Sequence, residues 1–295
     1  MTTLQLPSNT TPFPKDKMPP DRSIGAILVD SGLLTQEDAE QVLRLQKERG
    51  LRFGDAAVEL RLLSQEDIDF ALSNQFDYPY LRKGQSNVSA ELIAAYDPFD
   101  AQVEALRALR SQLMLRWFDA EANRKIMAVA SPGRGEGRSF LAANLAVVFS
   151  QLGERTLLID ADMRHPRQHE LFGLKNNTGL SSLLAGRGED AVHRIPALVG
   201  LSVLTSGPKA PNPQELLGRP AFKQLLAQLA PNFDVILIDT PAGTEYADGQ
   251  TVAVRAGSAM IVVRKNLSHI AAVRGLSEQF SESGVTVVGS ILNEF

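Results

Sequence analysis

The sequence predicts an α/β protein with a doubly wound, mostly parallel sheet, preceded by a small domain made only of helices. Three observations support this fold class: apolar runs alternate with helical patterns over the last two thirds of the chain, a glycine-rich turn follows the first of these runs, and a helical unit is repeated near the N-terminus. Strands covered by helices on both faces are expected to be continuously apolar, as most of these runs are.

Six segments of the C-terminal part are expected to be strands, because most are unbroken runs of Ile, Val and Leu. They are residues 125–130, 156–160, 201–205, 235–239, 258–263 and 286–292. Helical patterns lie between them, and this alternation favours a parallel sheet whose ligand site lies at the carboxyl ends of the strands.

The N-terminal part is expected to contain a disordered tail and then a helical domain. Residues 1–20 have the Thr- and Pro-rich composition of a tail. Residues 21–82 hold two similar units offset by 29 positions, so that Gly25 matches Gly54. Each unit predicts a short helix, a turn and a longer helix. Residues 83–97 are the expected linker to a second domain at 98–295.

Composition excludes several classes of protein. The chain of 295 residues has 44% hydrophobic and 22% charged residues, as ordinary globular proteins do. Its net charge of −4 argues against a nucleic-acid-binding surface over the whole protein. It has no cysteine, which excludes disulfides and thiolate chemistry. No apolar run approaches the ~20 residues of a spanning helix, so a membrane role is expected only through a partner.

Residues 130–139 (Ala-Ser-Pro-Gly-Arg-Gly-Glu-Gly-Arg-Ser) lie between an expected strand and an expected amphipathic helix over 140–152. A glycine-rich turn at a helix N-terminus forms a phosphate cradle of backbone N–H groups. The usual pattern ends Gly-Lys-Ser/Thr. Here Pro132 replaces the leading glycine and Arg138 replaces the lysine. The sequence therefore predicts a nucleotide site, and whether the nucleotide is turned over is left open.

Acidic residues follow two of the expected strands. One strand ends in Asp160-Ala-Asp162-Met-Arg164, and another ends in Asp239. Carboxylates at the same sheet edge as a phosphate loop suit a Mg²⁺–nucleotide site, because Mg²⁺ takes oxygen ligands and a carboxylate can accept a hydroxyl proton. The alternative is that each Asp only caps the turn that follows its strand.

These segments resemble the motifs of a known family. Residues 132–139, 157–164 and 235–241 look like the Walker A, Walker A′ and Walker B motifs of bacterial tyrosine kinases, P-loop proteins related to ParA/MinD ATPases that control exopolysaccharide chain length and export. Residues 211–217 and 289–293 resemble two further segments of that family. The resemblance covers about residues 99–295.

The resemblance implies ATP and Mg²⁺ as cofactors and assigns roles to residues. The catalytic group is Asp160, Asp162 and Arg138. The metal ligands are Ser139, Asp160 and Asp239. The nucleotide contacts are Gly133, Arg134, Gly135, Glu136, Gly137, Arg138, Ser139, Phe140, Arg164 and Asn293.

Glu104, Arg107 and Arg110 match the Glu-x-x-Arg-x-x-Arg oligomerisation motif of the same family. At ~100° per residue the three side chains lie within an arc of about 120° on a helix. The resemblance implies a ring-like homo-oligomer in which this trio makes subunit contacts. The alternative is a solvated charged face with one Glu–Arg pair.

Three departures from the family bear on function. Arg138 is longer and bidentate where the family has lysine. The family's C-terminal tyrosine cluster is missing, since the only tyrosines are Tyr78, Tyr80, Tyr96 and Tyr246. The family's membrane-spanning activator region is absent as well. We therefore expect a separate transmembrane chain-length determinant as partner, with this chain cytoplasmic and peripheral to the inner membrane through it.

The repeated unit resembles the N-terminal domain of type II secretion ATPases, including the version that binds cyclic di-GMP through tandem Arg-Leu-Gly-x-x-Leu units. Here Ser23 stands at the arginine position of the first unit, and Arg61 stands at the later glycine position of the second. Binding of cyclic di-GMP and a plain helical docking module are both open on this evidence.

Three functions are compatible with these observations. The first is an ATP-dependent protein-tyrosine kinase of exopolysaccharide assembly. The second is a catalytically weak ATP/ADP switch that controls the assembly of a transmembrane export partner. The third is a ParA-like ATPase acting on DNA or membrane position, but Gly133 occupies the position of that group's signature lysine.

Overall fold

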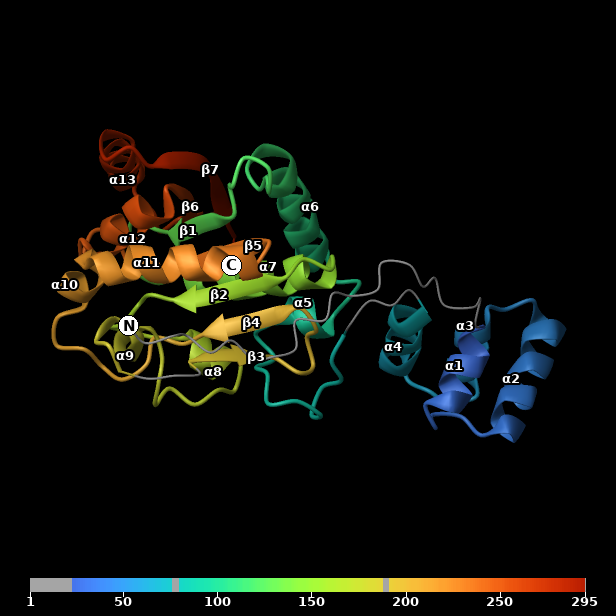
Figure 1. Ribbon diagram of the computed structural model, residues 1–295. Helices are drawn as coiled ribbons and strands as arrows, with labels where there is room; N and C mark the ends of the chain where they lie inside the picture. The colour runs from blue at the N-terminus through green and yellow to red at the C-terminus, as the bar shows by residue number, and fades with distance from the viewer. Residues whose placement is uncertain (1–22, 76–79, 188–190, 295) are drawn as a thin grey trace.

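The computed structural model describes residues 23–75, 80–187 and 191–294. Four helices of the N-terminal part lie to one side of a sheet that is covered by helices on both faces (Figure 1). Within the described residues, no helix is both long and apolar enough to cross a membrane.

The sheet has seven strands in the order β3-β4-β2-β5-β1-β6-β7. All pairings are parallel except that of β3 with β4. The strands are β1 (Ile126–Ala130), β2 (Thr156–Asp160), β3 (Val192–Arg194), β4 (Leu201–Leu204), β5 (Val235–Asp239), β6 (Ser258–Arg264) and β7 (Thr286–Asn293). The doubly wound, mostly parallel fold is thus confirmed, and six strands lie where they were predicted, to within one residue at each end.

The edge strand β3 was not predicted from the sequence. It has three residues, of which Val192 is buried, His193 is partly buried and Arg194 is exposed, so it contains no apolar run. It pairs antiparallel with β4, so that Val192 lies beside Leu204 and Arg194 lies beside Ser202.

Five longer helices cover the sheet, and two hydrophobic cores fill the space between them and its two faces. They are α6 (Ala101–Arg116), α7 (Arg138–Gln151), α11 (Pro220–Leu229), α12 (Asp248–Ala256) and α13 (Ile270–Glu282). The short elements are α8 (Gln168–Leu171), α9 (Leu180–Leu184), α10 (Pro213–Gly218) and the 3₁₀ turn η1 (Ala230–Asn232).

Helix α7 differs from the amphipathic helix predicted at 140–152. Almost all of its side chains are buried, because it packs on the sheet with one face and is covered by α5 (Ile93–Tyr96) and α6 on the other. Its small and apolar residues, such as Ala142, Ala143 and Val147, suit a helix enclosed on both sides.

The expected linker at 83–97 is wrong in its second half. Leu92, Ala94 and Ala95 are fully buried in the core of the α/β domain. Two polar side chains of α7 hold this segment: Asn144 accepts a hydrogen bond from the Ala94 N–H at 3.0 Å, and Gln151 donates to the Ala94 carbonyl at 2.9 Å. The segment around α5 is therefore part of the α/β domain.

The helical domain consists of α1 (Ile24–Asp30), α2 (Gln36–Arg49), α3 (Phe53–Glu59) and α4 (Gln65–Gln75), with a hydrophobic core of its own. The two predicted units are confirmed, and each longer helix has the expected N-cap. Thr35 and Asp38 form a capping box at α2, and Ser64 and Asp67 exchange the same hydrogen bonds at α4.

Candidate nucleotide-binding site

The loop between β1 and α7 has the backbone of an anion cradle. Gly135 and Gly137 have φ angles of 70° and 87°, a left-handed conformation that favours glycine. Gly137 is the N-cap of the 14-residue helix α7. The free N–H groups and the positive dipole end of this helix therefore face the loop, which is the arrangement that binds phosphate.

The shape of the loop is maintained by Glu136, whose side chain is buried. Its carboxylate accepts a hydrogen bond of 2.7 Å from the Gly133 N–H and another from the Ser268 hydroxyl. Asn293 Nδ2 donates to the Glu136 carbonyl at 3.2 Å, and Arg264 donates to the Gly135 carbonyl at 3.0 Å. Glu136 and Asn293, which were predicted to contact nucleotide, thus support the loop in this structure.

Arg138 points into the site and is only 9% exposed. Its three nitrogens face three different groups. Nη1 donates to the Ser131 hydroxyl at 2.6 Å, Nη2 lies 3.5 Å from Asp162 Oδ2, and Nε lies 3.3 Å from Asp239 Oδ1. The arginine that replaces the family's lysine therefore binds both carboxylates on its own.

Asp160 lies at the end of β2, and its side chain is fully buried. The backbone N–H groups of Asp162, Arg167 and Gln168 donate to it at 3.0 to 3.1 Å. Burial, together with the nearby charge of Asp239, raises the pKa of Asp160 well above its ordinary value. Asp160 thus also performs the turn-capping role that was its alternative prediction.

Asp239 lies at the end of β5, directly beside Asp160 in the register of the two strands. Burial raises the pKa of Asp239, while Arg138 and hydrogen bonds from Gln168 and Ser139 partly oppose this effect. Gln168 Nε2 donates to Asp239 Oδ2 at 2.8 Å, whereas Oδ1 receives no hydrogen bond. Gln168 was missed by sequence reasoning, because nothing in its local sequence marks it as a site residue.

A Mg²⁺ ion is compatible with the side chains at this point. The described residues contain no group of three or more His, Cys, Asp or Glu placed to hold a metal. Mg²⁺ at nucleotide sites needs fewer protein ligands, because phosphates and waters supply most of them. The Asp239 Oδ1 atom, a buried carboxylate oxygen without a donor, and the neighbouring Ser139 hydroxyl are suitable ligands.

A cavity of about 990 Å³ lies over the loop, within the range of ligand sites in proteins. It is lined by most of the predicted nucleotide contacts, by Asp162 and, on the opposite side, by α6 residues such as Gln102 and Leu109. Arg134 lies at its rim, where Nε is 2.9 Å from Glu245 Oε2. Gly133 and Arg164 do not line the cavity.

Arg164 is held beside this cavity rather than in it. Its guanidinium binds the buried Asp248 through two nitrogens, at 2.7 and 3.2 Å, and stacks 3.9 Å from the centre of the Tyr246 ring. The predicted contact between Arg164 and nucleotide stays a prediction.

Of the trio predicted to make subunit contacts, Arg110 is buried within the chain, so the alternative of one solvated charged face does not hold for it. Arg110 belongs to the buried stripe of α6 and donates to the Val148 carbonyl of α7 at 2.8 Å. Arg107 pairs with Glu104 at 2.8 Å and also donates to the Pro98 carbonyl at 2.8 Å.

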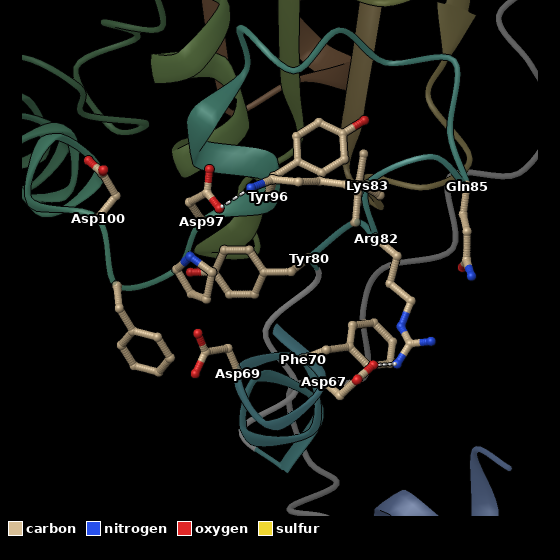
Figure 2. A pocket seen from close by; sticks show the side chains of 13 residues that line it. Asp67, Asp69, Phe70, Tyr80, Arg82, Lys83, Gln85, Tyr96, Asp97 and Asp100 are labelled. Carbon is tan, nitrogen blue, oxygen red and sulfur yellow. Dashed lines mark hydrogen bonds and ion pairs between the residues drawn. The ribbon is translucent and has the colours of Figure 1, made fainter. Parts of the chain in front are cut away.

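Arg107 also connects α6 to the junction with the helical domain, through a hydrogen bond from its Nη2 to the Tyr80 hydroxyl. Arg82 Nη2 lies 3.1 Å from Asp67 Oδ1 of α4, and the Arg82 guanidinium lies 4.3 Å from the centre of the Phe70 ring, also of α4 (Figure 2). Lys83 pairs with Asp97 at 3.0 Å. Residues 80–83 thus contact both α4 and the α/β domain through their side chains.

Comparisons with known proteins agree with this geometry. Residues 122–294 match the family model described as ParA: NUBPL iron-transfer P-loop NTPase. The tyrosine-protein kinase Wzc of Salmonella typhimurium is 38% identical over 205 residues, which are 69% of this chain and 28% of that protein. The tyrosine-protein kinase Etk of Escherichia coli is 35% identical over 202 residues, with coverage of 68% and 28%. The chain thus spans little more than a quarter of these relatives.

Solved structures give the same answer for the fold. The kinase domain of the Escherichia coli tyrosine kinase Etk has a TM-score of 0.66 and 32% identity, with 72% of this chain and 82% of that domain covered. The BceF tyrosine kinase domain has a TM-score of 0.63 and 31% identity, with coverage of 76% and 97%. The chain therefore belongs to the ParA family of P-loop NTPases, and within it to the Wzc/Etk-like domains of the bacterial tyrosine kinases.

Proposed function

We propose that this chain is an ATP-dependent protein-tyrosine kinase that regulates exopolysaccharide chain length or export. The observation that carries the proposal is the meeting of the phosphate loop with Asp160, Asp162 and Asp239 at the carboxyl ends of three adjacent strands, β2, β5 and β1. The names of the relatives, tyrosine-protein kinases Wzc and Etk, support the choice of tyrosine as acceptor.

The site residues divide the chemistry between them. In the proposed reaction a tyrosine oxygen attacks the γ-phosphorus of ATP, the bond to the bridging oxygen breaks, and ADP leaves. Asp162 lines the cavity, so its carboxylate can accept the phenolic proton, whereas Asp160 is fully buried. Ser139 and Asp239 would hold Mg²⁺, which supplies positive charge to the phosphates. Arg138 would bind the β- and γ-phosphates.

The test is phosphotyrosine formation by the purified chain with labelled ATP, with and without the cytosolic tail of its membrane partner. We expect labelled phosphotyrosine, and we expect Asp162→Asn to reduce it at least tenfold, about 1.4 kcal/mol of barrier. Asp55→Asn, at an exposed carboxylate of the helical domain that does not line the cavity, is the matched control.

The weak ATP/ADP switch is favoured by one observation, the pairing of Arg138 with both carboxylates. It predicts tight ADP binding with no phosphotyrosine under any of these conditions. A ParA-like ATPase acting on DNA or membrane position has less support, because the relatives named above are tyrosine kinases. A net charge of −4 likewise gives no support to nucleic-acid binding.

We propose further that the chain is cytoplasmic and reaches the inner membrane through a separate transmembrane activator. Homo-oligomer formation is also proposed, with Glu104, whose side chain is 73% exposed, as the member of the trio best placed for a neighbouring subunit. Light scattering should show that Glu104→Lys is smaller than the parent, while Glu121→Lys, an exposed charge reversal beyond α6, leaves the size unchanged.

For the helical domain the structure favours docking over cyclic di-GMP. A Cβ atom on Gly25 would lie 3.2 Å from the Phe53 ring, and one on Gly54 would lie 2.9 Å from the Ile68 side chain. Both glycines are therefore covered by the domain's own side chains. Calorimetric titration of the full chain with cyclic di-GMP tests this choice, and heat of binding at micromolar dinucleotide would contradict docking alone.

A further inference from the structure

We infer that Arg138 makes metal binding conditional on nucleotide: while the cradle holds no phosphate, the guanidinium charge lies against the carboxylate oxygens that a divalent cation would need. The inference rests on the proposed function only in taking a nucleoside di- or triphosphate as the ligand. Metal binding can be measured without phosphoryl transfer, so the two proposals can fail separately.

The geometry depends on the arginine fork. Arg138 donates hydrogen bonds through Nη1 to Ser131 and through Nη2 to Asp162, while Nε forms an ion pair with Asp239 without a hydrogen bond. A lysine ammonium carries its three donors and its charge on one nitrogen at the end of a flexible stem, whereas the arginine fork distributes them over three atoms in a plane. The replacement of lysine by arginine therefore changes how the carboxylates are occupied.

One oxygen atom is contested between the arginine and a metal. Gln168 already donates to Asp239 Oδ2, which leaves Oδ1 as the available oxygen, and Arg138 Nε lies 3.3 Å from it. The nearby Arg164 is held by Asp248 and does not compete for Asp239. A divalent cation at Oδ1 would face the guanidinium charge at close range in a buried site, where like charges repel strongly.

Phosphate is the group that can remove this block. The cradle places a bound phosphate at the N-terminus of α7, which begins with Arg138 itself. A phosphate offers the guanidinium a planar pair of acceptors and more charge than a carboxylate does. The arginine then exchanges Asp239 for phosphate and frees Oδ1, so that nucleotide binds first and metal second.

The experiment measures Mn²⁺ binding to the full chain from the free Mn²⁺ signal in electron paramagnetic resonance, with and without ADP. We expect the unmodified chain to bind Mn²⁺ only when ADP is present. We expect Arg138→Ala to bind Mn²⁺ without ADP at least about tenfold more tightly than the unmodified chain, and Arg138→Lys to be intermediate. Arg116→Ala, an exposed arginine outside the cavity, should behave as the unmodified chain does.

The double variant Arg138→Ala with Asp239→Asn should lose the ADP-independent binding, which locates the ion. Circular dichroism melts check that the variants fold, and Arg138→Lys carries the test if Arg138→Ala does not. The inference is overturned if the unmodified chain binds Mn²⁺ without ADP within about threefold of Arg138→Ala, or as tightly as Arg138→Lys. It is also overturned if ADP brings no Mn²⁺ binding. If Mn²⁺ binding follows the expected pattern but no phosphotyrosine forms, the proposed kinase function is contradicted and the inference about Arg138 is not.

Discussion

The helical domain and the α/β domain both depend on glycines, but the two domains use them differently. In the helical domain Gly25 and Gly54 have the ordinary backbone conformation of helices, and the side chains of Phe53 and Ile68 lie against them. In the loop before α7, glycines have left-handed φ angles, and a Cβ on Gly135 would meet nothing within 4 Å. One domain uses glycine to pack helices closely, and the other uses it to shape a backbone for a ligand.

Two buried arginines of the α/β domain likewise differ in role, one in packing helices together and the other in the candidate ligand site. Arg110 of α6 donates to a backbone carbonyl of α7 and so joins two helices of the core. Arg138 of α7 is equally buried, but it faces two carboxylates at the edge of a cavity, where a ligand can reach it. Both arginines belong to sequence motifs, so the motif alone does not tell a packing role from a binding role. The atoms that each guanidinium contacts in the folded chain make this distinction.

The largest effect should come from Gly137→Ala. The left-handed backbone at this N-cap is strained for alanine, so the cradle should deform and ADP affinity should fall on the order of 100-fold, or about 2.7 kcal/mol. Calorimetric titration gives the affinity. A variant that binds ADP as tightly as the parent would show that the left-handed glycine is not needed for nucleotide binding. It would then contradict the different roles given to glycine in the two domains.

Gly54→Ala tests the other side of the comparison. Its Cβ would lie 2.9 Å from a methyl group of the buried Ile68, and this overpacking should lower the free energy of unfolding of the helical domain by about 2 kcal/mol. ADP affinity should not change. Gly25→Ala, at 3.2 Å from Phe53, is the control with a smaller expected loss in urea unfolding.

Asp160 should give the α/β domain a pH dependence that the helical domain does not share. Its pKa is raised in the folded state by burial, so the unfolded chain binds fewer protons above pH 3.8, and the free energy of unfolding should fall as pH rises toward the folded-state pKa. The fall amounts to about 1.4 kcal/mol for one pKa unit. Urea unfolding in EDTA at several pH values measures it, and Asp160→Asn should reduce it to the part contributed by Asp239, whose pKa is also raised by burial.

Asp38 and Asp67 of the helical domain should behave in the opposite way. Hydrogen bonds from Thr35 lower the pKa of Asp38, and those from Ser64 lower the pKa of Asp67 against the effect of its partial burial. Their contribution to stability is therefore present above pH 3.8 and is lost below it. A helical domain that loses stability between pH 4 and pH 7 would contradict the difference between the domains.

The smallest effect should be a gain. Gly32 and Arg61 occupy equivalent positions of the repeat, and both are left-handed, with φ angles of 71° and 57°. Arg61→Gly should therefore stabilise the helical domain by about 1 kcal/mol, because it removes the strain of a side chain in this conformation. Arg61→Ala keeps the Cβ atom and is therefore the control. If both variants raise the free energy of unfolding equally, the gain comes from removing the rest of the arginine side chain and not from relief of backbone strain.

Local sequence was sufficient for several elements of this protein. The strands were predictable because strands buried on both faces need unbroken apolar runs, as in 156–160 and 235–239. The helical repeat was predictable because its caps and glycines recur at a fixed offset. The phosphate loop was predictable because glycines at set positions are a requirement of the backbone, whatever surrounds them.

The remaining features depend on residues that meet only after folding. The edge strand β3 forms because β4 offers it a partner, and α5 is held in place by Asn144 and Gln151 of α7, which lie 50 and 57 positions away from Ala94 in the sequence. Arg110 is buried because α7 covers its face of α6. These interactions have no local signature, since each depends on the distance between two segments rather than on the residues of one.

The nucleotide site combines both kinds of information. The sequence alone predicts that Arg138 and the carboxylates lie at one edge of the sheet, because the carboxyl ends of parallel strands lie on the same side. The pairing of Gln168 with one oxygen of Asp239 and of Arg138 with the other depends on how the whole domain folds. Side-chain pairing of this kind is set by distances of a few ångströms, and those distances are fixed by the packing of the whole domain.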